Sequence, residues 1–98
     1  LPMLYFNYAR VLDLCGRYEE GAECAANGRK SCLKYGHYQY IPGCLEIEAE
    51  CSHFMGDDKR SADLYRKCYY LCQVIEYPVG LQTVKKEASE YLGIEFES

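Results

Sequence analysis

Cysteine and histidine can each take part in nucleophilic catalysis or bind a metal, and this 98-residue chain has seven cysteines and two histidines. A nucleophilic cysteine needs a neighbouring base and a group that orients that base. His53 follows Cys51 by two residues, so in a helix the two side chains lie on different faces. The sequence has neither a phosphate-binding glycine loop nor a Ser-His-Asp order. We therefore predict that the chain is not an enzyme.

The cysteine spacing argues against a structural zinc site and against a disulfide framework. No Cys-x-x-Cys occurs and the count is odd, whereas zinc sites use close pairs and disulfide frameworks an even number. Three pairs instead have helical spacings that put both members on one face: Cys24/Cys32, Cys44/Cys51 and Cys68/Cys72. This pattern predicts free, buried thiols and hence a reducing, cytoplasmic compartment. The alternative is that one exposed thiol makes the chain a redox sensor.

Three oxygen and nitrogen ligands fall on one helical face, at Glu46, Glu50 and His53. A metal site from these residues is conceivable. One stripe of ligands, however, shows neither the second shell nor the open geometry of a metal centre. We therefore expect no metal and no cofactor.

The elements that position these residues are all predicted to be helices. Apolar residues recur at spacings of three and four, and the three prolines stand where helices would begin. Nothing alternates with period two for long enough to form a sheet. The expected fold class is all-α with about five helices, over approximately 2–15, 18–34, 40–55, 58–76 and 78–92.

The chain also matches itself when it is shifted by 40 residues. Between residues 1–40 and 41–80, five positions are identical: Pro2/Pro42, Ala9/Ala49, Gly16/Gly56, Ala22/Ala62 and Cys32/Cys72. A fixed period of this size indicates stacked repeats, in which each unit buries its apolar face on the next. We predict a single domain over 1–98, with units at about 2–36 and 40–76 and a capping helix at about 79–92.

These residues resemble the tetratricopeptide repeat, a pair of antiparallel helices with small residues where the helices cross and glycine in the turn. The turn glycines are Gly16 and Gly56, and Tyr18 matches the aromatic residue after the turn. The crossing positions are all small: Ala9, Gly21, Gly28, Ala49, Ser61 and Cys68. The period of 40 is longer than the usual ~34 residues, and helix-pair repeats of other families share these features. The resemblance implies antiparallel helix-pair repeats stacked as an α-solenoid.

The resemblance further implies a groove, lined by the first helix of each unit, that takes an extended peptide or a partner helix. The positions that match are Phe6, Arg10, Asp13, Glu46, Glu50 and His53, and the last helix would add Lys85 or Ser89. In such a groove Arg10 would hold a carboxylate of the partner. Glu46 and Glu50 would hold a basic side chain or an amino terminus. The alternative is an ordinary solvated face.

Charge and hydropathy exclude two classes of partner. The net charge is −4 and the basic residues are scattered pairs, so this segment lacks the basic stripe that phosphate neutralisation requires. We expect no nucleic-acid contact by this segment. The apolar runs are much shorter than the ~20 residues of a membrane helix, so no membrane span is expected.

Long, cysteine- and tyrosine-rich repeats of this kind are similar to the C-terminal regions of certain Gram-positive helix-turn-helix transcriptional regulators. That similarity implies a peptide-binding and dimerisation module, a fragment of a longer protein whose DNA-binding head is not part of this chain. The expected partners are a peptide or protein and a second copy of the chain. The alternative is a stand-alone scaffold for protein–protein interaction.

Overall fold

The computed structural model describes residues 2–96 and confirms the all-α fold with five helices. They are α1 (Pro2–Leu14), α2 (Tyr18–Tyr35), α3 (Ile41–Phe54), α4 (Asp58–Val74) and α5 (Pro78–Leu92), and a 3₁₀ turn, η1 (Tyr38–Tyr40), precedes α3. Within residues 2–96 there is no strand. The observed helix bounds lie within two residues of the predicted ones.

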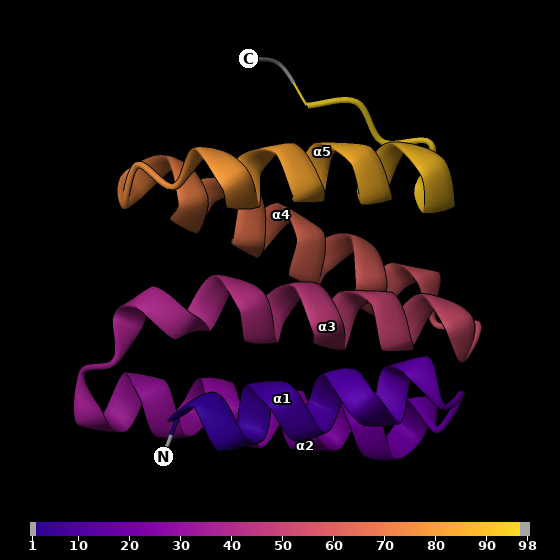
Figure 1. Cartoon of the computed structure of the whole chain (residues 1–98). Helices are drawn as coiled ribbons and strands as arrows, with labels where there is room; N and C mark the ends of the chain where they lie inside the picture. The colour runs from indigo at the N-terminus through magenta and orange to yellow at the C-terminus, as the bar shows by residue number, and fades with distance from the viewer. Residues whose placement is uncertain (1, 97–98) are drawn as a thin grey trace.

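The helices stack in chain order, from α1 and α2 at the bottom of Figure 1 to α5 at the top. Each helix packs on the next, and α3 also contacts both α1 and α5. The first helix of each predicted pair thus lies beside the first helix of the next pair. Because α3 has neighbours on several sides, most of its residues are buried, as its two apolar faces predicted.

Small residues let the helices approach closely where they cross, and all six predicted crossing positions are buried. A Cβ atom added at Gly28 would lie 2.7 Å from Cβ of Tyr5, so no side chain fits between α1 and α2 there. In the α3–α4 crossing, the hydroxyl of Ser61 donates to the carbonyl oxygen of Ala49 at 2.8 Å. The thiol of Cys68 donates to the carbonyl oxygen of Pro42 at 3.3 Å.

The two short turns have the same backbone geometry 40 residues apart. Gly16 and Gly56 have φ of 77° and 86°, a region that favours glycine. The amide of Arg17 donates to the carbonyl of Leu12, and the amide of Asp57 donates to that of Ser52, both at 2.9 Å. These shared turns explain why glycine recurs at this interval.

Asp57 begins α4 as a side-chain cap. Its Oδ1 accepts a hydrogen bond from the amide of Arg60 at 3.2 Å, which satisfies one of the free donors of the first turn. No helix in the described part of the chain is long and apolar enough to cross a membrane.

Candidate functional site

Four of the six predicted groove residues meet in one charged cluster between α1 and α3. Arg10 Nη2 lies 2.6 Å from Glu46 Oε1, and Arg10 Nη1 lies 3.3 Å from both Glu50 Oε1 and Asp13 Oδ2. The Arg10 side chain is 31% exposed, whereas Asp13 and Glu46 are buried. One guanidinium therefore binds three carboxylates from two helices.

The last helix adds a fourth carboxylate to the cluster. The hydroxyl groups of two tyrosines donate hydrogen bonds to its carboxylates. Glu87 on α5 accepts from the hydroxyl of Tyr65 at 2.8 Å, and Glu50 Oε2 accepts from that of Tyr91 at 2.8 Å. Carboxylate oxygens of Glu46, Glu50 and Glu87 lie within 4.8 Å of one another. We call the residues Arg10, Asp13, Glu46, Glu50, Tyr65, Glu87 and Tyr91 the carboxylate cluster.

The sequence did not predict the residues that α4 and α5 contribute to the carboxylate cluster, Tyr65, Glu87 and Tyr91. From the last helix, the sequence indicated Lys85 or Ser89 for the groove; in the structure Ser89 donates to Glu95 at 2.7 Å. Tyr91 lies 41 residues after its partner Glu50, so a shift of 40 does not find it. The available signal was the pair Glu87 and Tyr91, four residues apart and hence on one face of α5.

The remaining two predicted groove residues lie at the edges of the cluster. Phe6 packs against Gly43, where an added Cβ would lie 2.5 Å from its ring. The ring of His53 stacks on Tyr91 with centroids 4.8 Å apart, and its Nδ1 lies 2.8 Å from Asp58 Oδ1. His53 is therefore not among the residues whose ligand atoms converge, and the converging trio contains Glu87 in its place.

Burial and mutual repulsion shift the cluster toward protonated carboxyl groups. Burial, with repulsion from Glu46, raises the pKa of Glu87 to about 8. Burial and the neighbouring Glu50 raise the pKa of Asp13 to about 7. Burial also raises the pKa of Glu46, although Arg10 opposes that rise. Four carboxyl groups face one guanidinium, so the cluster retains protons near neutral pH.

One oxygen of the cluster has no hydrogen-bond partner. Glu46 Oε2 is fully buried and unpaired, while Oε1 of the same side chain binds Arg10. An unpaired buried carboxylate oxygen is costly, and a proton shared with Glu87 or a bound cation would satisfy it.

A divalent metal fits these residues poorly. Arg10 already contacts Oε1 of Glu46 and of Glu50, and tyrosine hydroxyls contact Glu50 Oε2 and Glu87 Oε1. Ca²⁺ needs six to eight oxygen ligands at about 2.3–2.6 Å, and Mg²⁺ needs a near-ideal octahedron. The nearby positive charge of Arg10 further opposes a second cation of charge two.

Glu87→Gln tests the protonated state of the cluster. The raised pKa means that Glu87 contributes fully to stability below its unfolded-state value of about 4.5, and that this contribution is lost as pH rises through about 8. Glutamine imitates the protonated acid at every pH. Between about pH 5 and pH 9 the free energy of unfolding should therefore fall less in the variant than in the parent. We expect the difference between the two decreases to be about 2 kcal/mol, a value reduced for solvent screening because Glu87 is partly exposed.

The measurement is urea denaturation of both proteins at several pH values. The matched control is Glu90→Gln, which removes the same charge from an exposed position of α5. Parallel pH profiles of the parent and Glu87→Gln would show that Glu87 is ionised throughout.

A cavity of about 110 Å³ opens beside the carboxylate cluster, between α1, α3 and α5. Glu46 is the one charged residue among its described lining residues, which are otherwise mostly apolar or small: Phe6, Pro42, Gly43, Cys68, Tyr77, Val79, Gly80, Thr83 and Val84. We call this cavity the Glu46 cavity.

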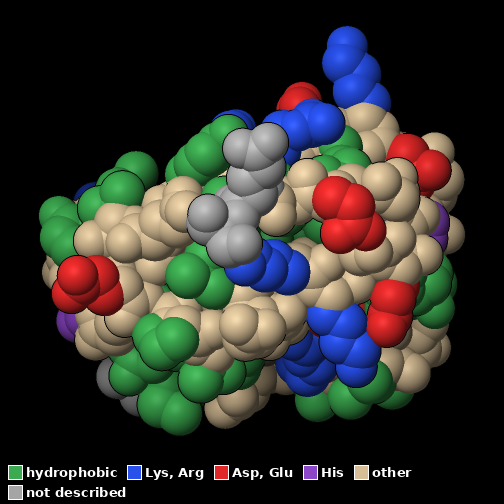
Figure 2. Space-filling model, turned by 90° about the horizontal axis from the view of Figure 1, so that it is seen from above, with side chains coloured by type: hydrophobic (Ala, Val, Ile, Leu, Met, Phe, Trp, Pro, Cys, Tyr) green, Lys and Arg blue, Asp and Glu red, His purple; other side chains and the backbone are tan. Residues whose placement is uncertain are grey.

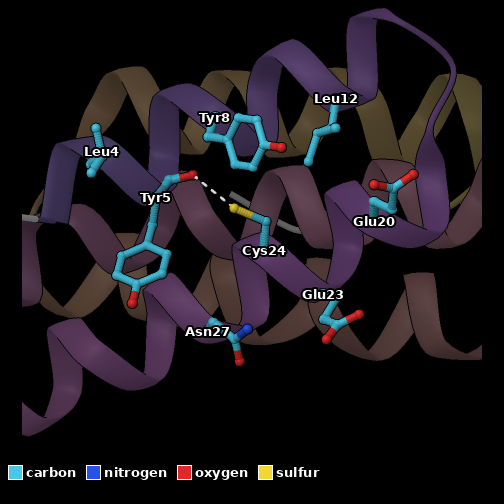
Figure 3. Close-up of a pocket in the computed structure, with 8 residues that line it drawn as sticks. All are labelled: Leu4, Tyr5, Tyr8, Leu12, Glu20, Glu23, Cys24 and Asn27. Atoms are coloured by element: carbon cyan, nitrogen blue, oxygen red, sulfur yellow. Dashed lines mark hydrogen bonds between the residues drawn. The ribbon is translucent and has the colours of Figure 1, made fainter.

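A second hollow lies on the outer side of the first helix pair (Figure 3). It encloses about 640 Å³, with Leu4, Tyr5, Tyr8 and Leu12 from α1 facing Glu20, Glu23, Cys24 and Asn27 from α2. The thiol of Cys24 donates to the carbonyl of Tyr5 at 3.5 Å. The exposed apolar side chains of α1 extend this hollow into a patch: Met3, Leu4, Tyr5, Tyr8, Val11 and Leu14.

The thiols differ sharply in exposure. Cys15 is exposed and Cys24 is half-buried, whereas the other five, Cys32, Cys44, Cys51, Cys68 and Cys72, are buried. Burial raises the pKa of Cys24, and burial with neighbouring thiols raises that of Cys44 to about 12. This bears out the predicted buried thiols for these five residues.

We expect a thiol-specific reagent at neutral pH to label Cys15 rapidly, Cys24 more slowly, and the other five at the rate of unfolding. Mass spectrometry of the native protein over time measures this, with urea-unfolded protein as the fully labelled control. Rapid labelling of Cys51 or Cys68 would contradict the burial order. Complete resistance of all seven would end the redox-sensor alternative.

On the face seen from above, Lys, Arg, Asp and Glu side chains are interspersed (Figure 2). Among protein-family models, curated proteins and solved structures, no match to this chain was found.

Proposed function

We propose that this chain is a peptide- or protein-binding module whose α1–α3–α5 groove takes a segment with basic side chains. The observation that carries the proposal is the charge imbalance of the carboxylate cluster, where Arg10 faces Asp13, Glu46, Glu50 and Glu87. A partner's cation would replace the protons that the cluster otherwise retains. Three helices supply the carboxyl groups of the site, so an occupant that contacts them would stabilise the packing of these helices.

The experiment is a fluorescence anisotropy titration with blocked nonapeptides that carry three lysines, three glutamates or no charge. We expect the lysine peptide to bind best and Glu50→Gln to weaken its binding about tenfold, since the carboxylate cluster would lose one of its excess negative charges. Glu90→Gln is the control for net charge. Equal binding of all three peptides, or equal loss in both variants, would refute the groove.

We further propose that the module is the C-terminal regulatory domain of a bacterial transcriptional regulator. The resemblance to such tails supports this proposal. A bound peptide would bias the packing between helix pairs, and that packing would set the spacing of two DNA-binding heads. The full-length reading frame tests it: about 60 to 70 upstream residues with a basic helix-turn-helix pattern would support the regulator. Their absence would favour the stand-alone scaffold.

The apolar patch on α1 supports dimerisation as a second role of the module. A second copy carries the same patch, so one two-fold contact would cover both. We expect light scattering to give a dimer and Tyr8→Glu to give a monomer, because Tyr8 is 56% exposed within the patch. A parent protein that is monomeric at high micromolar concentration would overturn this role.

A further inference from the structure

The Glu46 cavity combines a small apolar space with one buried acceptor. Its volume is about 110 Å³. Valine, proline and phenylalanine side chains line it. At two lining glycines the protein's own side chains fill the space of a side chain, the Phe6 ring at Gly43 and the Tyr77 ring at Gly80. A row of methylene groups would gain hydrophobic burial on such walls.

The acceptor is Glu46 Oε2, which is buried and has no partner. The Glu46 side chain is 10% exposed, and Arg10 fixes its other oxygen at 2.6 Å. The carboxylate is therefore held in place before any ligand arrives. A charge-assisted hydrogen bond from a cation would satisfy the orphan oxygen.

The geometry distinguishes between the two basic side chains. A guanidinium is a planar fork that prefers both oxygens of a carboxylate, and Glu46 offers one because Arg10 holds the other. An ammonium is a compact point charge on a linear four-carbon stem, and it needs a single strong acceptor with room for its stem.

We propose that the Glu46 cavity is a subsite for a lysine side chain of the segment that occupies the groove. The proposal rests on the proposed function and names the residue type that the groove selects. The methylene stem lies against Val79, Val84 and Phe6, and the ammonium donates to Glu46 Oε2. Entry of the ammonium releases to solvent the proton that Glu87 retains near neutral pH.

The experiment uses n-butylammonium, the lysine side chain without its backbone, as the probe. Isotope-labelled protein is titrated by NMR with n-butylammonium, n-butylguanidinium and n-butanol in separate series. We expect n-butylammonium to shift the amides of Gly43 and Gly80 and the methyls of Val84 saturably. The guanidinium and the alcohol should bind at least about tenfold more weakly.

Two variants test separately the contribution of the Glu46 carboxylate and that of the cavity volume to n-butylammonium binding. Glu46→Gln should weaken n-butylammonium about tenfold, and Glu90→Gln should not. Thr83→Met keeps the charge of Glu46 and fills the cavity, so it should also abolish the NMR shifts caused by n-butylammonium. This second variant keeps the test decisive if Glu46→Gln folds poorly. Saturable shifts elsewhere, or equal affinity for n-butanol, would overturn the lysine subsite. Shifts of the Glu46 side chain by Mn²⁺ or Mg²⁺ alone, without n-butylammonium binding, would overturn it in favour of a metal.

The peptide and n-butylammonium titrations together distinguish failure of the lysine subsite from failure of the proposed function. Lysine peptides that bind through Glu50 while n-butylammonium leaves the cavity unshifted would keep the groove and remove the subsite. Acetylation of each peptide lysine in turn identifies the one that enters the cavity. An n-butylammonium site without any peptide binding would remove the peptide-binding module.

Discussion

Replacing Arg10 with methionine should destabilise the protein by about 3 kcal/mol near pH 8 and by much less near pH 5. Methionine keeps most of the apolar stem but leaves Asp13, Glu46 and Glu50 without their shared cation. Breaking a buried ion pair by removing one partner typically costs about 3–5 kcal/mol, and we take the low end because the Arg10 side chain is 31% exposed.

The pH dependence follows from the sign of the pKa changes. Without Arg10, the pKa values of the buried carboxyl groups rise further above those of the unfolded chain. A raised folded-state pKa gives stability that is fully present below the unfolded pKa and lost as pH rises through the folded one. At acidic pH the protonated carboxyls no longer need the guanidinium, so the cost of the substitution shrinks.

Urea denaturation at about pH 5 and about pH 8 measures both values. Arg17→Met is the matched control, because Arg17 pairs with Glu20 on an exposed surface and its loss should leave stability unchanged. A loss from Arg10→Met that is the same at both pH values would mean that the cluster is held by packing and not by charge.

Gly28→Ala should destabilise the protein by about 2 kcal/mol, although alanine is the better helix former. The added Cβ would lie 2.7 Å from Cβ of Tyr5 and 3.2 Å from Sγ of Cys44. Tyr5 Cβ is attached to the backbone of α1, so α1 itself must move. Overpacking a core costs about 1–3 kcal/mol, while the gain in helix propensity is at most about 1 kcal/mol.

The thermal midpoint of Gly28→Ala is compared with that of Asn27→Ala, an exposed neighbour on the same helix. Asn27→Ala gains the higher helix propensity of alanine without a steric clash, so it should be slightly more stable than the parent. An increase in stability for Gly28→Ala would show that α1 and α2 are less closely packed than the structure indicates.

The helices and their turns were predictable because local signals determine them. Proline begins α1, α3 and α5 at or near their first turn, Asp57 caps α4, and glycine recurs where the short turns need a positive φ. The small residues at the crossings were also recognisable, because glycine inside a helix is unfavourable unless a neighbour approaches closely.

The candidate site was predictable only for the residues on α1 and α3, whose positions follow helical periodicity and the 40-residue repeat. Glu46 and Glu50 share one face of α3, so their convergence needs helical periodicity alone. Their meeting with Arg10 follows from the stacking of α1 on α3, which the 40-residue period indicated. Glu87 and Tyr91 do not follow that period, because α5 places a different set of residues toward α3.

By itself, then, the sequence determined an all-α chain of five helices with a set of charged residues spaced for one groove. The tertiary structure decided which charges meet. It placed four carboxyl groups around one guanidinium, left Glu46 Oε2 buried without a partner, and opened an apolar cavity beside it. The physical reason is that periodicity fixes the face on which a residue lies, whereas pKa shifts and orphaned acceptors depend on the distances and burial that helix packing creates.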